Sequence, residues 1–250
     1  MRSVLTLGAA ALALAVAGCS GSGSGNNAAA ANSAAPLAQI PAPNHGDWSE
    51  IATMTDRGSY LLGNPNAPVK LVEYASISCP HCAEFTEAAA TPLRERYVRS
   101  GQVSWEYRPY MIFPTDLGIF LLLRCMGPQP FFRTAEQLYA DQRNWEGRVQ
   151  ALPQDQLQQM DTLPPAQKAA ALVRAAGLDS FFRQRGLPEG RMSSCLSDAA
   201  ATQQLQQIST RGNNEDGVTG TPTFIVNGNV RPGAIDDAYL AELVKLKKRS

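Results

Sequence analysis

Four residues, Cys79-Pro80-His81-Cys82, stand at a junction between two kinds of local structure. The apolar run 69–74 before them predicts a buried strand, and the residues from Pro80 to about Arg99 predict a helix with one apolar face. Two cysteines separated by two residues can close to a disulfide and reopen. The start of a helix carries unpaired N–H groups and a partial positive charge, which favour a thiolate over a thiol. The junction therefore predicts a redox-active dithiol.

The N-terminus predicts a targeting segment. Arg2 precedes the apolar run 4–18, which is too short to cross a membrane as a helix. The run ends in Val-Ala-Gly-Cys at 16–19, which resembles the lipobox of bacterial lipoproteins. The resemblance implies a signal peptide over 1–18 and a lipid anchor on Cys19; the alternative is an ordinary secretory signal with Cys19 incidental. Both interpretations place the protein in the periplasm or cell envelope, where disulfides persist.

Composition sets the limits of the folded part. Residues 19–47 are mostly Gly, Ser, Asn, Ala and Pro, so they predict a flexible tether that buries too little apolar surface to fold. The folded part is expected over 48–250. The chain has 22 basic and 22 acidic residues, and its basic residues do not alternate with aromatic ones. This balance argues against a nucleic-acid-binding protein.

Strand-like segments flank a long helical block. The expected strands are 56–63, 69–76, 103–111, 223–227 and 229–231, with an Asn227-Gly228 hairpin turn between the last two. Between them the sequence is rich in Ala, Gln, Leu and Arg and is divided by Pro and Gly into helix-length pieces. The expected helices of this block are 116–126, 130–142, 154–162, 165–176, 180–185 and 197–211. A last helix is expected from Asp236 to Lys248, so the order predicts an α/β domain with a helical insertion.

The dithiol junction, the helical block and residues 218–224 (Val-Thr-Gly-Thr-Pro-Thr-Phe) together resemble DsbA-like thiol:disulfide interchange proteins of the thioredoxin superfamily. The resemblance spans about 50–250. It implies a thioredoxin-like fold with a large inserted α-helical subdomain. The thioredoxin parts would be about 59–113 and 214–250, and the insertion about 114–213.

The same resemblance implies roles at the dithiol. The bond between Thr221 and Pro222 is expected to be cis, and this loop and Pro80 are expected to contact the substrate chain; an ordinary trans turn is the alternative. Cys79 would be the nucleophile and Cys82 the resolving thiol. His81 would stabilise the Cys79 thiolate, unless it is merely an exposed histidine.

Three further residues carry predictions. Glu73 interrupts the apolar strand at the position where DsbA-like proteins have a buried acid, so it could exchange protons with Cys82; the alternative is a carboxylate paired with lysine or arginine. Cys125 and Cys195 form an even pair in the helical block. In an exported protein such a pair is more often a structural disulfide than two free thiols.

The resulting hypothesis is a monomeric oxidoreductase without cofactor or metal. It would donate the Cys79–Cys82 disulfide to reduced or unfolded exported proteins, and a DsbB-type membrane quinone reductase would reoxidise it. Thr221 keeps open a disulfide reductase or isomerase of the same fold. A peptide-binding holdase chaperone, which would stay active after Cys79→Ser, and a Cu(I) carrier are the alternatives from other classes.

Overall fold

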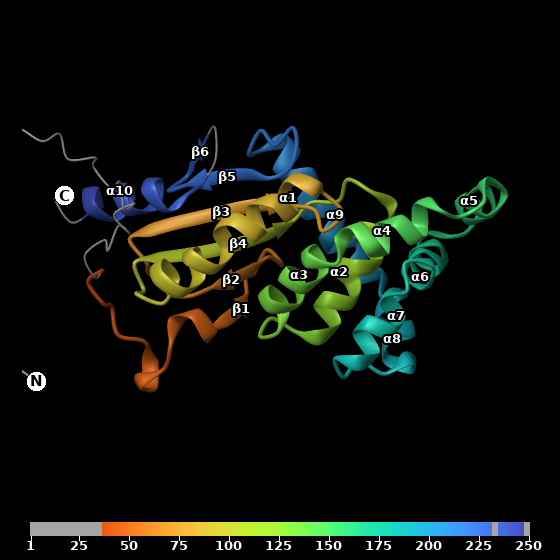
Figure 1. Ribbon diagram of the computed structural model, residues 1–250, viewed down its shortest axis with the longest axis horizontal. Helices are drawn as coiled ribbons and strands as arrows, with labels where there is room; N and C mark the ends of the chain where they lie inside the picture. Colours follow the sequence, from red (N-terminus) through yellow and green to blue (C-terminus); the bar gives the residue numbers. More distant parts are fainter. Residues whose placement is uncertain (1–36, 232–234, 248–250) are drawn as a thin grey trace, which may run out of the picture. The chain divides into compact units, whose positions relative to one another are not determined.

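A six-stranded mixed sheet organises the chain. The computed structural model describes residues 37–231 and 235–247 (Figure 1). The strand order is β1-β2-β4-β3-β5-β6; β3 and β4 pair in parallel, and every other neighbouring pair is antiparallel. The strands are β1 (Ala52–Met54), β2 (Tyr60–Leu62), β3 (Val69–Ala75), β4 (Val103–Pro109), β5 (Thr223–Val226) and β6 (Asn229–Arg231).

The register of the central strands decides which side chains share a face. Glu73 of β3 lies opposite Tyr107 of β4 and Phe224 of β5. Directly paired residues point to the same face of a sheet. All three side chains are buried, so the acidic residue predicted in this strand lies inside the core among aromatic residues.

The helix after β3 changes its winding along its length. It begins as α1 (Pro80–Phe85) and continues as two π-helical stretches, Thr86–Ala90 and Leu93–Val98. The second stretch begins after Pro92, which has no N–H to donate to the preceding turn. The helix therefore accommodates Pro92 with wider turns on both sides of it.

The helical insertion follows β4, and its helices gather beside the ends of β3 and β4, where α1 begins (Figure 1). Its helices are α2 (Pro114–Met126), α3 (Phe131–Ala140), α4 (Gln142–Gln150), α5 (Gln154–Asp161), α6 (Pro165–Ala175), α7 (Leu178–Gln184), α8 (Glu189–Leu196) and α9 (Ala199–Asn214). The predicted thioredoxin-like fold with an inserted helical subdomain is confirmed. The sequence analysis missed α4 and α8, because α4 is almost entirely polar and α8 contains Gly190 and two serines.

The C-terminal hairpin and helix follow their local signals. Asn227 and Gly228 both have positive φ, 50° and 83°, as a two-residue hairpin turn of this type requires. The last helix, α10 (Asp237–Lys247), begins after Asp236, whose side chain accepts a hydrogen bond from the N–H of Tyr239 at 2.8 Å.

The N-terminal boundary differs from the prediction. Residues 37–47, assigned to the tether, contact the domain: the N–H of Ile40 donates to the carbonyl of Ser100 at 2.8 Å, and Gln102 donates to the carbonyl of Ala38 at 2.8 Å. Leu37 packs against the core. Polar composition suggested a tether, but backbone groups found partners on the domain surface. The predicted signal peptide over 1–18, the lipidation site Cys19 and the tether up to residue 36 lie outside the described residues.

Within the described ranges, none of the helices has the length and apolar character needed to cross a membrane.

The edge strand β1 was not predicted. It is only three residues long, and the alternation of its side chains is too brief to be recognised.

A disulfide joins Cys125 at the end of α2 to Cys195 in α8, with Cα atoms 6.0 Å apart. It encloses 70 residues of sequence separation, including α3 to α7. The crosslink therefore restricts the unfolded insertion more than any local contact does.

Replacing both Cys125 and Cys195 by alanine should lower the free energy of unfolding by about 4 kcal/mol, because the unfolded chain regains loop entropy. Urea denaturation monitored by circular dichroism measures the change. As a control, the Cys79→Ala/Cys82→Ala variant should lose a similar amount when a reductant opens its remaining disulfide. An unfolding free energy that is unchanged in both experiments would contradict the stabilising role.

Candidate active site

Cys79 lies where the sheet meets α1. A short loop, residues 76–78, leads from β3 to Cys79, which is the residue that caps α1 and has extended backbone angles (φ −88°, ψ 121°). Pro80 is the first helical residue and is exposed. Its missing N–H costs nothing at this position. The loop thus delivers the Cys79 side chain to the positive end of the helix.

The pKa of Cys79 falls from its ordinary value of 9.0 to about 5. The largest cause is a hydrogen bond with the thiol of Cys82, and burial opposes it. The hydroxyl of Thr221 and the backbone N–H groups of Cys82 and His81 lower the pKa further. Cys79 is therefore a thiolate at neutral pH, the form that attacks disulfides and that leaves from them.

Cys82 has the opposite character. Its side chain is fully buried, and burial raises its pKa far above the ordinary range, with further contributions from Cys79 and the charge of Glu73. Both cysteines are free thiols in this structure. The two sulfurs are thus unequal, since Cys79 holds the negative charge and Cys82 holds the proton.

The loop before β5 closes over the dithiol. The Thr221–Pro222 peptide bond is cis, and the Cys79 thiol donates to the carbonyl oxygen of Thr221 at 3.2 Å. These residues are 142 positions apart in sequence. The hydroxyl oxygen of Thr221 is buried without a partner. It can donate to Cys79 once that sulfur carries a charge, which agrees with its effect on the Cys79 pKa.

The imidazole of His81 pairs with Glu84 at the surface. Its Nδ1 is 3.1 Å from Oε2 of Glu84, one helical turn on, and 72% of the side chain is exposed. A hydrogen bond to Glu84, the charge of Glu84 and then the charge of Cys79 raise the pKa of His81. The N–H of His81 acts on Cys79 directly, whereas its ring acts through charge at the surface.

Glu73 lies in the core below the dithiol. Its Oε2 accepts a hydrogen bond from Nε1 of Trp105 at 2.9 Å, and its Oε1 has no partner. Burial raises the pKa of Glu73 from 4.5 to about 8; the bond to Trp105 opposes this, and the charge of Cys79 adds to it. No lysine or arginine among the described residues pairs with this carboxyl group. Glu73 can therefore hold a proton beside Cys82 near neutral pH.

The insertion adds residues that the sequence analysis did not find. Glu146 of α4 has a pKa raised to about 7 by burial and by the charges of Asp116 and Cys79. Asp116 and Gln142 bind the backbone of the loop before Cys79. Glu146 lies in α4, which was not predicted, and Gln142 was predicted only as the end of the preceding helix. Asp116 was predicted only as the start of a helix.

An apolar groove extends from the dithiol. It has a volume of about 560 Å³ and runs between the helix that begins at α1 and the β5–β6 hairpin. His81 and Pro222 stand on its wall together with the aromatic rings of Phe85 and Phe224. Val230, 55% exposed, also lines it. The groove offers apolar surface to a chain that reaches Cys79.

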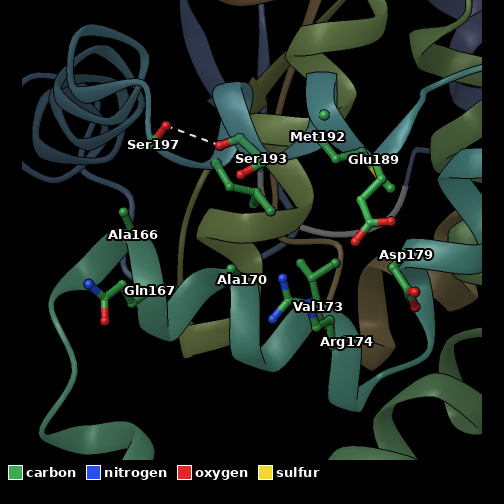
Figure 2. A pocket seen from close by; sticks show the side chains of 12 residues that line it. Ala166, Gln167, Ala170, Val173, Arg174, Asp179, Glu189, Met192, Ser193 and Ser197 are labelled. Atoms are coloured by element: carbon green, nitrogen blue, oxygen red, sulfur yellow. Dashed lines mark hydrogen bonds between the residues drawn. The ribbon is translucent and has the colours of Figure 1, made fainter.

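A second cavity, of about 310 Å³, lies within the insertion between α6, α7 and α8. Figure 2 shows the charged side chains of Arg174, Asp179 and Glu189 around its apolar floor. None of the predicted site residues lines it. Within the described ranges, no group of three or more histidine, cysteine or acidic side chains is arranged to hold a metal ion.

Known proteins are similar to this chain in sequence and in fold. The sequence model of the family described as thioredoxin matches residues 55–246. A protein of Rickettsia felis named "Putative protein-disulfide oxidoreductase" is 25% identical over 179 residues, which cover 72% of this chain and 56% of that protein. A protein of the same name from Rickettsia bellii is 25% identical over 72% of this chain and 61% of its own length. The chain thus spans less than two thirds of the curated relatives it matches.

Solved structures resemble it over more of their length. The protein-disulfide isomerase of Novosphingobium aromaticivorans is 28% identical, with a TM-score of 0.69 over 76% of this chain and 97% of that one. Wolbachia pipientis alpha-DsbA1 is 20% identical, with a TM-score of 0.61 over 78% of this chain and 94% of that one. The second similarity shows a shared fold.

The buried carboxyl of Glu73 should make stability depend on pH. Because its pKa is raised from 4.5 to about 8, the folded chain keeps a proton that the unfolded chain releases. Stability from this group is complete below pH 4.5 and is lost as pH rises through 8. In Glu73→Gln this loss should shrink by roughly 3–5 kcal/mol.

Urea denaturation of the dithiol form at both ends of that pH range measures the difference. The separate titration of Cys79 is present in both parent and variant, so the comparison leaves Glu73 and its coupling to the Cys79 charge. The exposed Glu87→Gln serves as the control and should follow the parent. Parallel pH profiles for the parent and Glu73→Gln would mean that Glu73 ionises normally.

Proposed function

Because this chain belongs to the thioredoxin family, we propose that it is a DsbA-type protein thiol:disulfide oxidoreductase of the cell envelope. In this role it donates the Cys79–Cys82 disulfide to reduced or unfolded exported proteins. The observation that carries the proposal is the inequality of the two sulfurs. A cysteine with a pKa near 5 lies beside one whose pKa is raised, at the start of a helix.

The reaction needs two thiols of the substrate and no other reactant. A substrate thiolate attacks the Cys79 sulfur of the disulfide, the Cys79–Cys82 bond breaks, and Cys82 leaves with the electron pair. A second substrate thiolate then attacks the substrate sulfur of the mixed disulfide, and Cys79 leaves as a thiolate. The substrate loses two electrons and two protons. The pair gains both electrons and one proton and ends as a Cys79 thiolate and a Cys82 thiol, and the other proton is released to solvent.

Glu73 supplies the proton for the first step. Cys82 leaves inside the core, where an unpaired negative charge is costly. Glu73 keeps a proton near neutral pH and has one oxygen without a partner. It can protonate Cys82 as the bond breaks and take the proton back in the reverse reaction.

The proposed direction is oxidation of the substrate. Stabilising the Cys79 thiolate stabilises the reduced form of the pair, so the disulfide becomes a stronger oxidant. The N–H groups at the start of α1 and the hydroxyl of Thr221 supply this stabilisation. The surface charge of His81 is a further contribution, and it falls when the imidazole loses its proton.

Substrate and partner chains would bind along the cis-proline loop and the apolar groove. Pro80 follows Cys79, and the carbonyl oxygen of Thr221 contacts its sulfur, while Pro222, the next residue, lines the groove. An extended chain with apolar side chains suits this surface, whether it comes from an unfolded protein or from a DsbB-type membrane quinone reductase. Such a reductase would reoxidise the pair by the same exchange in reverse.

The envelope location rests on separate observations. The N-terminal sequence to Cys19 predicts export and lipid anchoring. The disulfide between Cys125 and Cys195 is of the kind that persists in an oxidising compartment. A lipid-anchored monomer with its dithiol facing the periplasm satisfies both.

A disulfide isomerase or reductase is the second candidate. Thr221 is the residue type that such proteins of this superfamily often carry before the cis-proline, and the Novosphingobium aromaticivorans protein is named an isomerase. The reduction potential of the Cys79–Cys82 couple separates the two candidates. Equilibration in glutathione buffers, with Cys125 and Cys195 replaced by alanine, gives a single couple.

A potential well above thioredoxin's roughly −270 mV should be found if the chain is an oxidase. In the same assay, Cys79→Ser should abolish oxidation of a reduced peptide. Cys82→Ser, mixed with the same peptide in its disulfide form, should instead accumulate a mixed disulfide between Cys79 and the peptide. The Cys79 thiolate attacks the peptide disulfide, one peptide thiol leaves, and no second cysteine resolves the product, which mass spectrometry detects. A potential near or below thioredoxin's would favour a reductase, and full activity in Cys79→Ser would exclude an oxidoreductase.

A further inference from the structure

The loop before Cys79 is buried, so its backbone groups need partners inside the protein. Residues 76–78 form this loop, and three helices of the insertion supply the partners. The carbonyl oxygen of Ser76 accepts from the N–H of Cys79 at 3.2 Å and from the hydroxyl of Tyr139 in α3 at 3.1 Å. The other contacts come from α2 and α4.

One peptide group of the loop is held at both ends. The carbonyl oxygen of Ile77 accepts from Nε2 of Gln142 at 2.6 Å, and the N–H of Ser78 donates to Oδ1 of Asp116 at 3.1 Å. These atoms belong to the same trans peptide group, whose C=O and N–H point in opposite directions. The two side chains therefore hold it from opposite sides, and rotation of its plane breaks both hydrogen bonds.

Each of the two side chains is itself fixed. Gln142 also donates to the carbonyl of Cys79 at 3.0 Å. Asp116 is fully buried, and its carboxylate accepts further hydrogen bonds from the hydroxyl of Ser76 and the N–H groups of Ile112 and Phe113 at 2.8–2.9 Å. A carboxylate with this many donors has little freedom to move.

We propose that Asp116 and Gln142 are positioning residues for the nucleophile, and we call the pair the insertion clamp. The clamp fixes the Ile77–Ser78 peptide group, and this sets the direction in which the Cys79 side chain points. That direction aims the sulfur at the N–H groups of His81 and Cys82. The inference deepens the proposed function and rests on it, since it assigns to the insertion control over the reactivity of Cys79.

Two substitutions remove the clamp without adding charge. Gln142→Met keeps the length of the side chain but donates to neither carbonyl, and Asp116→Asn replaces one acceptor oxygen by a donor. The rate of Cys79 alkylation by iodoacetamide at mildly acidic pH reports its thiolate directly. Each variant should react about five- to tenfold more slowly, because a misaligned sulfur loses hydrogen bonds that stabilise its charge. The pH midpoint of the thiolate's ultraviolet absorbance should rise in parallel.

The controls are exposed residues of the same types. Gln150→Met at the end of α4 and Asp155→Asn in α5 should alkylate at the parent rate. Both clamp residues hold the same peptide group, so removing the second one should add little. The alkylation rate of the double variant should stay within about twofold of the rate of the slower single variant. A double variant whose rate falls by the product of the two single reductions would contradict the proposal that both residues act on one peptide group.

Circular dichroism and urea denaturation show whether each variant is folded. Should Gln142→Met not fold, Gln142→Asn, which is one methylene shorter and cannot reach both carbonyls, tests the same contact. Folded variants of both residues with parent alkylation rates and midpoints would overturn the clamp. Alkylation needs no protein substrate, so the two proposals can fail separately. A parent protein without thiol–disulfide exchange activity would refute the proposed function, whereas the alkylation rates would still test the clamp.

Discussion

The charge on Cys79 is the constraint on which the rest of the structure depends. A thiolate in a largely buried position persists only if donors surround it. Here the donors are the thiol of Cys82, the hydroxyl of Thr221 and the first N–H groups of α1. They come from a helix start and from a loop 142 residues away, so the sheet must bring β3 and β5 side by side before the site exists.

Burial has the opposite effect on the two groups beneath Cys79. Cys82 and Glu73 have no comparable set of donors, so burial raises both pKa values and keeps both groups protonated near neutral pH. Donors thus keep Cys79 negatively charged, whereas burial keeps Cys82 and Glu73 protonated and neutral. The negative charge therefore lies on Cys79, and the protons lie on the two groups in the core.

The sequence identified the parts of this site that depend on local pattern. A strand followed by two cysteines at a helix start predicted the dithiol of Cys79 and Cys82. The roles of Glu73 and of the Thr221–Pro222 loop were instead implied by the resemblance to DsbA-like proteins. The orientation of His81 was not predictable, because an exposed ring chooses among neighbours and Glu84 is one turn away. Gln142 and Glu146 were missed since the helix that carries them has too few apolar residues to show a period.

The residues that sequence patterns did not reveal are the ones through which the insertion contacts the active-site loop. A helix whose outer face is polar has little pattern, yet its buried polar side chains are the ones that contact the active-site loop. Gln142 is 4% exposed and Asp116 is fully buried, and each is bonded to backbone atoms of the loop. Burying polar groups is costly unless every donor and acceptor is paired. Here side chains of the insertion pair with backbone groups of the loop, so the insertion helps to hold the loop that carries Cys79.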